Sequence, residues 1–398
     1  MVDVPPALVA ARGATLRPPA IVAPAPRQVS FGHVYGSVSP GTTRVLVKVN
    51  GVLQGSRAPR RGRYHFTLDL PARHVTIRVV AQDVAGNRRF RIVRNVFGLP
   101  RAGSPKPPRP SAEDGRLAQL VRQLARGYGG TAGVYVQSLQ TRRGAAWNAR
   151  ARFPAASTIK LAIAVEVLRT LGAVPQPSGR LDGLLRRMLV YSDNEAANSL
   201  LTWLGGSTSG GSDRVNAMLR SLGIRETIMY GGYEVSTAAA RPIPLRVEEQ
   251  PAFGIGKYTT AYDLARLHGA VFSAAGGRGG LVRLRGSFTP ADARFLLWIL
   301  AHVGDRGKLG RFLPETVPVL HKAGWITTAR HDAGIVFWRG GSYVVAVMTW
   351  RGSGVGSASD VLSGRIAVGA LRRFQALRKA ASATTTTTAG SATLASLG

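Results

Sequence analysis

The stretch Phe153-Pro-Ala-Ala-Ser-Thr-Ile-Lys-Leu-Ala-Ile-Ala-Val-Glu-Val-Leu168 is the most informative part of this chain. Its apolar run predicts a buried helix that begins near Ser157, which places Ser157 and Lys160 on one helix face. A serine hydroxyl is a poor nucleophile until a neighbouring base takes its proton, and a lysine amine can do so. A serine at a helix N-terminus also offers its backbone N–H group to a developing oxyanion. The stretch therefore predicts a nucleophile, Ser157, and its base, Lys160.

Lysine is rare in this chain, which gives Lys160 more weight. Among 53 basic residues only seven are lysines: Lys48, Lys106, Lys160, Lys257, Lys308, Lys322 and Lys379. A guanidinium keeps its proton at working pH, whereas a lysine amine can lose it and act as a base. The alternative interpretation is an ordinary surface lysine whose stem packs along its helix.

The formal net charge of +33 is extreme for a chain of 398 residues. Such a charge favours anionic partners, namely nucleic acid, acidic lipid or anionic cell-wall polymers. The arginines are scattered, however, and no nucleic-acid-binding motif stands among them, so we expect no nucleic-acid function. Cysteine is absent, which excludes disulfides and thiolate metal sites. The seven histidines show no ligand spacing and no phosphate-binding loop stands out, so we expect neither metal nor cofactor.

Composition divides the chain into five segments. Residues 1–27 are rich in Pro and Ala, but arginines interrupt them, so they do not form a clean signal peptide. Residues 28–98 hold short alternating runs and the hairpin signal Asn50-Gly51, which predicts a small β-sandwich. Residues 99–110 form a Pro-rich linker, 111–380 a second domain, and 381–398 a low-complexity tail that we expect to be disordered. No apolar run is long enough to cross a membrane, so no transmembrane segment is expected.

The second domain mixes helical and strand patterns. Ser111-Ala-Glu-Asp114 is a capping signature for a first helix. Further helices are predicted near 181–191, 259–272, 290–302 and 361–380, and strands near 133–139, 144–148, 333–338 and 342–350. Strands at both ends with helices between them predict an α+β fold, in which helices flank one antiparallel sheet.

Ser192-Asp193-Asn194 is a second candidate for chemistry. A serine or aspartate before a helix is also an ordinary N-cap, so one of the two residues is expected to serve that purpose. In the catalytic interpretation the Ser192 hydroxyl relays a proton to a leaving nitrogen. The Asn194 amide then holds an amide of the substrate.

Lys322-Ala323-Gly324 is a third candidate, and Trp325 follows it directly. A lysine, a small residue and a glycine suit an edge strand that another backbone approaches closely. Lys322 would attract a substrate carboxylate, and the N–H group of Trp325 would be a second oxyanion donor. The alternative is a surface strand with an ordinary lysine.

S-x-x-K, S-D-N and a K-[TS]-G-like triplet occur here in that order, and together they resemble the signature of the penicillin-recognising serine enzymes. The stretches that begin at Arg152, Tyr191, Gly256 and Lys322 resemble the class A β-lactamase branch, and the similarity spans about residues 112–380. The resemblance implies a helical subdomain beside a sheet flanked by helices, with Ser157 in the cleft between them. Residues 28–98 resemble bacterial immunoglobulin-like domains attached to cell-surface enzymes, which implies a wall-binding or spacing module.

The chain departs from the family pattern in three places. The interval from Ser157 to Ser192 is short, which implies a reduced helical subdomain. Ala323 stands where the family prefers a hydroxyl residue that helps to hold the substrate carboxylate. The Ω-loop motif E-x-x-L-N, whose glutamate positions the deacylating water in the family, is missing. Glu234 is the nearest replacement, Glu226 is a poorer one, and Glu248 and Glu249 fall in an insertion.

The sequence therefore predicts a serine hydrolase of the class A β-lactamase type, which would degrade β-lactams through a Ser157 acyl-enzyme and confer antibiotic resistance. One alternative is a penicillin-binding D,D-peptidase or esterase with slow deacylation, and another is a non-catalytic cell-wall-binding protein. The expected partners are a β-lactam or peptidoglycan-like small substrate and anionic wall polymers. We expect an extracytoplasmic location, secreted or associated with the wall, although no clean signal peptide is visible.

Overall fold

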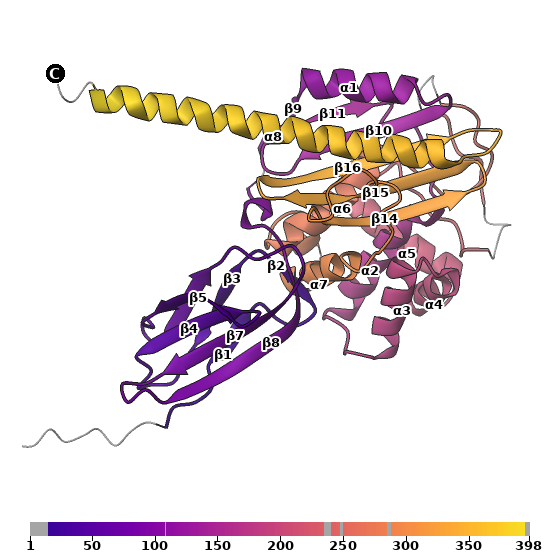
Figure 1. Ribbon diagram of the computed structural model, residues 1–398. Helices are drawn as coiled ribbons and strands as arrows, with labels where there is room; N and C mark the ends of the chain where they lie inside the picture. The colour runs from indigo at the N-terminus through magenta and orange to yellow at the C-terminus, as the bar shows by residue number, and fades with distance from the viewer. Residues whose placement is uncertain (1–14, 108, 235–239, 247–249, 285–287, 395–398) are drawn as a thin grey trace, which may run out of the picture. The chain divides into compact units, whose positions relative to one another are not determined.

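The computed structural model describes residues 15–107, 109–234, 240–246, 250–284 and 288–394 (Figure 1). The chain divides into two compact units, and the division falls between Arg101 and Ala102. This point lies inside segment 99–110, for which the sequence predicts a linker.

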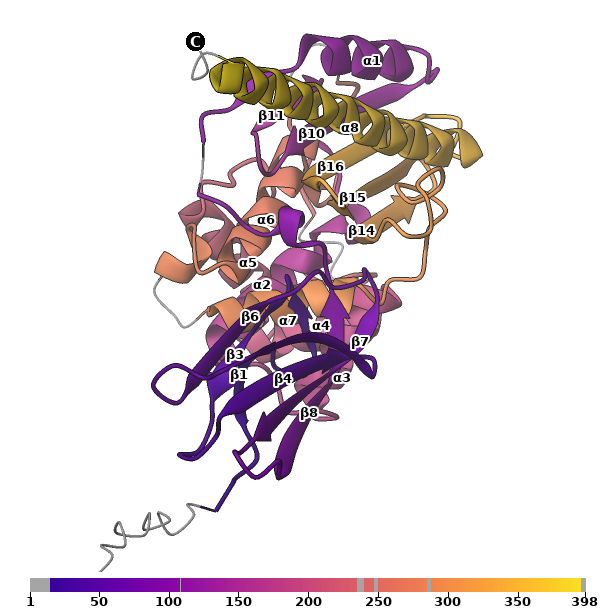
Figure 2. The same ribbon diagram turned by 60° about the vertical axis from the view of Figure 1, so that its left-hand side comes forward.

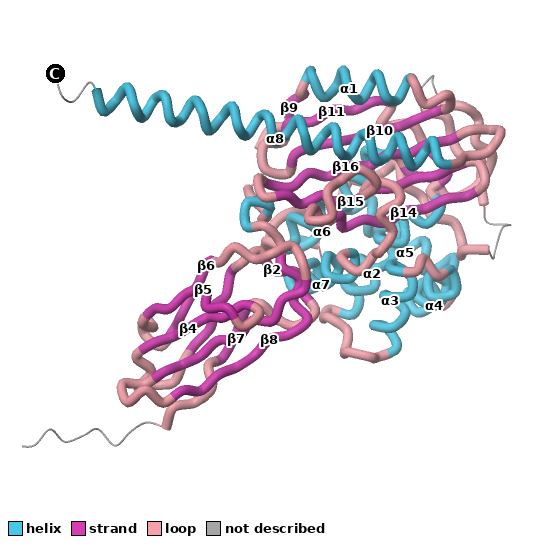
Figure 3. The backbone as a smooth tube through the Cα atoms, viewed as in Figure 1, coloured by secondary structure: helices cyan, strands magenta, loops and turns pink. Residues whose placement is uncertain are grey.

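The first unit is built from two β-sheets, whose strands Figure 3 shows. The three-stranded sheet has the order β1-β3-β6, with β1 at Ala20–Ala23, β3 at His33–Ser37 and β6 at Arg63–Thr67. The five-stranded sheet has the order β2-β8-β7-β4-β5, with β2 at Gln28–Ser30, β8 at Arg88–Gly98, β7 at His74–Gln82, β4 at Arg44–Val49 and β5 at Val52–Arg57. Alternate apolar side chains of both sheets are buried in one shared core. The predicted sandwich is confirmed, and β1 extends it to residues before 28.

The hairpin between β4 and β5 forms where the sequence predicts it. Asn50 has φ +49° and Gly51 has φ +87°, so both turn residues adopt the left-handed region that an Asn-Gly turn requires.

The second unit contains a six-stranded sheet with the order β14-β15-β16-β10-β11-β9. The strands are β9 (Ala112–Glu113), β10 (Thr131–Ser138), β11 (Arg143–Trp147), β14 (Val319–Ile326), β15 (Ala329–Trp338) and β16 (Gly341–Trp350). All neighbours pair antiparallel except the two-residue pairing of β11 with β9. The strands come from both ends of the domain, as predicted, and β14 forms one edge of the sheet.

Helices cover both faces of this sheet. Helices α1 (Gly115–Arg126) and α8 (Ser357–Leu394) pack on one face around a buried apolar cluster. Helix α6 (Ala261–Ala275) packs on the other face, next to the helices α2 (Lys160–Leu171), α3 (Arg180–Val190), α4 (Asn194–Gly205), α5 (Thr208–Ser221) and α7 (Pro290–Leu300). Figures 1 and 2 show α1 and α8 on the side of the sheet opposite α6. The α+β fold with a helical subdomain is thereby confirmed.

Two local predictions differ from the structure. Asp114, not Ser111, caps α1 by accepting from the N–H group of Leu117, because residues 112–113 first pair with β11 as a short strand. Helix α8 continues to Leu394, into segment 381–398, which the sequence predicts to be disordered. Within the described residues, no helix combines the length and the apolar character needed to span a membrane.

Candidate active site

Ser157 lies in a 3-10 turn, η2 (Ala156–Ile159), which leads directly into α2. Residues 161–168 are all buried, which explains the apolar run after Lys160: α2 is a central helix of the subdomain. The turn is fixed by the Thr158 hydroxyl, which donates to the carbonyl of Ala155 at 2.6 Å. Ala156 has φ +47°, an unusual conformation for a non-glycine residue directly before the predicted nucleophile. Ser157 itself is half-buried, so its hydroxyl lies at the border between core and solvent.

Lys160 is the first residue of α2, and its side chain is fully buried. Its Nζ donates to the carbonyl of Ser192 at 2.5 Å and to Oδ1 of Asn194 at 2.6 Å. Burial, followed by the charge of Lys322, lowers the pKa of Lys160 to about 7. A neutral amine has two hydrogens, so these two acceptors use both and leave the lone pair available one helical turn from Ser157.

Ser192 connects the two lysines of the site. Its carbonyl accepts from Lys160, and its hydroxyl accepts from Nζ of Lys322 at 2.9 Å. The neighbouring Asp193 caps α4 by accepting from the N–H group of Ala196. Because Asp193 performs the capping, the Ser192 hydroxyl is free to point toward Lys322. Ser192 also has φ +61°, so the backbone is strained at this connection.

The third motif lies on β14, where Gly324 contacts the turn that carries Ser157. A Cβ atom on Gly324 would lie 2.5 Å from the backbone nitrogen of Ser157 and 2.7 Å from that of Thr158. Only glycine fits this approach. It follows that Ala323, Gly324 and Trp325 pass directly beside Ser157. Trp325 is 66% exposed, and as part of an edge strand β14 leaves alternate N–H groups unpaired by β15.

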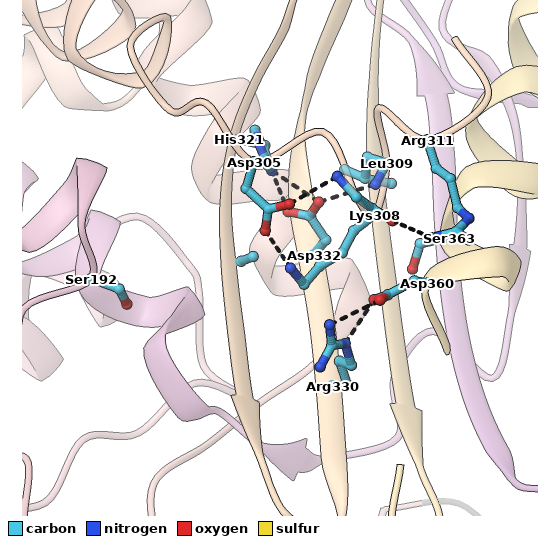
Figure 4. A network of polar contacts seen from close by, with 12 residues as sticks. Ser192, Asp305, Lys308, Leu309, Arg311, His321, Arg330, Asp332, Asp360 and Ser363 are labelled. Carbon is cyan, nitrogen blue, oxygen red and sulfur yellow. Dashed lines mark hydrogen bonds and ion pairs between the residues drawn. The ribbon is translucent and has the colours of Figure 1, made fainter. Parts of the chain in front are cut away.

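A group of polar and charged side chains lies beside Lys322. Burial lowers the pKa of Lys322 to about 8, while Asp332 acts in the opposite direction. Asp332 accepts from Nδ1 of His321 at 2.8 Å and from the N–H group of Leu309 at 3.2 Å. Figure 4 shows Asp332 and His321 gathered with Asp305 and Lys308, which form an ion pair, while Ser192 lies across from them. These groups hold β14 and Lys322 in place.

Tyr233 occupies the space beside Lys160. Its ring centre lies 4.4 Å from Nζ of Lys160 and 4.9 Å from Nζ of Lys257. The backbone of Tyr233 is fixed by Asn198, whose side chain accepts from its N–H group at 2.7 Å and donates to its carbonyl at 2.9 Å. Burial raises the pKa of Tyr233, so the phenol stays neutral at working pH.

The candidate glutamates are placed differently. Glu234 is exposed, has φ +58°, and lies close enough to Lys160 for its charge to raise the pKa of that lysine. Glu226 accepts from Arg152 in a half-buried ion pair, so it serves as a structural partner. Glu248 and Glu249 lie outside the described residues.

The structure brings together the residues of all three sequence motifs. Sequence reasoning did not identify Tyr233, Asn198, Lys257 or Asp332. The scarcity of lysine was a usable signal for Lys257, whose Nζ donates to the carbonyl of Gly232 at 2.5 Å. No comparable signal marks Tyr233, because a tyrosine in a loop is common.

A sequence model described as the Beta-lactamase enzyme family matches residues 116–174 and 175–374 of this chain. The chain belongs to this family. Among solved structures, PBP-A is 21% identical, with a TM-score of 0.53, and the match covers 68% of this chain and 99% of that one. A variant of PBP-A in an acyl-enzyme complex with penicillin G is 22% identical, also with a TM-score of 0.53. That match covers 68% of this chain and 100% of the PBP-A chain. A β-lactamase from Streptosporangium roseum is 19% identical and has a TM-score of 0.52, and the match covers 66% of this chain and 99% of that one.

These structural matches establish the β-lactamase-like fold of the second unit. A search among curated proteins finds no match.

Proposed function

We propose that the second unit is a serine hydrolase that forms an acyl-enzyme on Ser157 with β-lactams or peptidoglycan-like amides and hydrolyses it slowly. One observation carries the proposal: Ser192 contacts both Lys160 and Lys322 while Gly324 lies against the backbone of Ser157. The predicted nucleophile, a lysine with a lowered pKa and a second buried lysine thus lie in the same part of the fold.

In the proposed acylation, neutral Lys160 takes the proton of the Ser157 hydroxyl as its oxygen attacks the carbonyl carbon. The N–H groups of Ser157 and Trp325 stabilise the negative oxygen of the tetrahedral intermediate. The carbon–nitrogen bond then breaks, and the Ser192 hydroxyl passes a proton to the leaving nitrogen. Lys322, whose Nζ donates to the Ser192 hydroxyl, then returns a proton to Ser192.

Asn194 and Lys322 orient the substrate in this proposal. Lys322 carries its charge into a largely desolvated position, where attraction to a substrate carboxylate is stronger than at the surface. Ala323 has no hydroxyl to add to this contact, so Lys322 and Trp325 supply the recognition on β14.

Slow deacylation is supported by Tyr233. Hydrolysis of an acyl-enzyme requires a base that activates water next to the acylated serine. The loop residue in contact with Lys160 is a neutral phenol, and the candidate carboxylate, Glu234, is exposed. The alternative outcome is efficient β-lactamase turnover with Glu234 as the base, which the effect of its charge on Lys160 favours.

The location and the small-molecule partners follow from the same proposal. Enzymes that act on peptidoglycan-like amides meet their substrate outside the cytoplasm, so we propose an extracytoplasmic location. The first unit, for which an immunoglobulin-like class was predicted, would then be a spacer or an attachment module.

Mass spectrometry of the intact protein during incubation with penicillin G tests the proposal, together with nitrocefin hydrolysis. We expect a persistent mass increase equal to one penicillin and little hydrolysis, and no adduct on Ser157→Ala. A transient adduct with steady hydrolysis would contradict slow deacylation and would indicate that the protein is an efficient β-lactamase. No adduct on the folded wild-type protein would leave the non-catalytic wall-binding alternative.

A further inference from the structure

The first unit contains a groove of about 1110 Å³ beside the exposed face of its three-stranded sheet. Its lining includes His33 and Tyr35 from β3, Arg63 and His65 from β6, and Arg57 and Arg60 from the end of β5 and the following loop. Among the described residues that line this groove, none carries a carboxylate. All lining residues belong to the first unit, so the groove is a property of that unit alone.

Several groups in the groove are held in place before any ligand arrives. The Arg57 guanidinium lies 4.6 Å above the ring centre of Phe66, and it donates to the carbonyl of His65 at 2.5 Å. Nδ1 of His33 and Nε2 of His65 are 3.1 Å apart. The rings of Tyr35 and His65 pack edge to face. A preorganised guanidinium loses less conformational entropy when it binds an anion.

The positive charge of the groove is not neutralised within the unit. None of the ion pairs found among the described residues includes Arg57, Arg60 or Arg63. Burial, followed by the charges of His65 and Arg101, lowers the pKa of His33. Protonation of His33 is therefore already disfavoured by the positive charges around it. An anion in the groove would relieve this repulsion.

We propose that this groove binds a linear polymer of phosphodiester-linked polyols. Guanidinium groups keep their positive charge at any working pH and attract phosphate oxygens, and three of them lie within seven residues of the groove lining. Single-stranded nucleic acid requires several aromatic platforms for successive bases, whereas in the described lining the His33 and His65 rings stack on each other and Tyr35 is the exposed tyrosine ring. The phosphate backbone is therefore the part that the groove fits. This inference does not depend on the chemistry of Ser157.

Fluorescence anisotropy of the full chain with a labelled synthetic glycerol phosphate oligomer tests the proposal. The groove variant carries Arg57→Gln, Arg60→Gln and Arg63→Gln together. The matched control carries Arg44→Gln, Arg88→Gln and Arg89→Gln, which remove the same charge from exposed positions outside the groove lining of the same unit. Thermal melting of both variants establishes that they are folded.

We expect the groove variant to bind about tenfold more weakly or worse, and the control to change by about twofold or less. Equal losses in both variants would mean that only the overall net charge attracts the polymer, which would overturn the proposal. A single-stranded DNA of equal charge that binds more tightly, and through the same three arginines, would overturn the choice of polymer. Absence of binding to the wild-type chain at low salt would overturn the site itself.

Discussion

The two units use positive charge in opposite ways. In the hydrolase unit Lys160, Lys308 and Lys322 are buried, and Lys160 and Lys322 have lowered pKa values. In the sandwich groove the cations are exposed arginines, which stay charged at any working pH. The comparison teaches that the groups whose charge can change near neutral pH are buried lysines of the hydrolase unit, whereas the groove relies on arginines, which keep their charge.

The distribution of lysine along the chain supports this division. Four of the seven lysines, namely Lys160, Lys257, Lys308 and Lys322, lie in or beside the candidate active site. Burial lowers the pKa of a lysine because the charged form loses its hydration, and this brings the neutral amine within reach of neutral pH. An arginine in the same place would stay charged.

The largest effect is expected for Lys160→Arg, which keeps the charge and removes the base. Acylation of Ser157 by penicillin G should slow by about a thousandfold, because a guanidinium cannot accept the serine proton. The measurement is the time course of adduct mass. Lys48→Arg, in the sandwich, is the matched control and should acylate at the wild-type rate. If a folded Lys160→Arg variant is acylated at the wild-type rate, Lys160 is not the base, and the contrast between the lysines and the groove arginines does not hold.

The next effect is expected for Tyr233→Glu, which places a carboxylate beside Lys160. Deacylation should accelerate by about a hundredfold, since the site would gain a base for water. The decay of the adduct after removal of free penicillin measures this rate. Tyr233→Phe keeps the ring and adds no base, so its adduct should persist as in the wild type. If the two variants deacylate alike, Tyr233 is not the position that limits turnover.

A smaller effect is expected for Asp332→Asn. The charge of Asp332 raises the pKa of Lys322, which burial holds at about 8, so the substitution lowers that pKa further. At pH values near 7.5 less Lys322 is then protonated, and a substrate carboxylate is held more weakly. We expect the acylation rate with penicillin G to fall by about tenfold at that pH. The decline of this rate on the alkaline side of its pH profile should shift to lower pH.

The pH profile of acylation separates this effect from simple destabilisation. In the wild type the rate should rise as the pH increases through about 7, where Lys160 loses its proton, and fall above about 8, where Lys322 does. Asp360→Asn removes another largely buried carboxylate of the same unit, one that pairs with Arg330, and should leave both limbs in place. An unshifted alkaline limb in Asp332→Asn would contradict the role of Asp332.

The smallest effect is expected for Arg63→Lys in the groove. Both residues stay charged at this exposed position, so affinity for the glycerol phosphate oligomer should change by about threefold or less. The same exchange of lysine and arginine is severe at Lys160, and this contrast tests the comparison directly. A large loss in Arg63→Lys would show that the groove depends on two-point guanidinium geometry at this position.

The sequence predicts most of the fold because its patterns are locally consistent. The apolar run after Lys160, the Asn50-Gly51 turn and the long buried strands near the C-terminus each determine their own element. The start of α1 was misplaced because pairing of residues 112–113 with β11 depends on a distant strand. The length of α8 was underestimated because the low-complexity composition of residues 381–398 predicts disorder, whereas the helix continues to Leu394.

The candidate site was predictable where residue type alone limits the chemistry. Ser157, Lys160, Ser192 and Lys322 combine a predicted nucleophile with titratable groups, and Ser192 contacts both lysines. The position of Tyr233 depends on Asn198, which holds its backbone from another element of the fold. Loop placement of this kind is a tertiary property, and residue spacing along the chain does not encode it.

The contact of Gly324 with the backbone of Ser157 joins two parts of the chain that are made far apart in time during synthesis. A nascent chain that has not yet produced β14 has the serine and its lysine but lacks half of the pocket. Covalent labelling by a fluorescent penicillin would therefore report completed folding of the hydrolase unit, molecule by molecule. In this way, labelling of Ser157 would show that β14 has reached its place beside the serine.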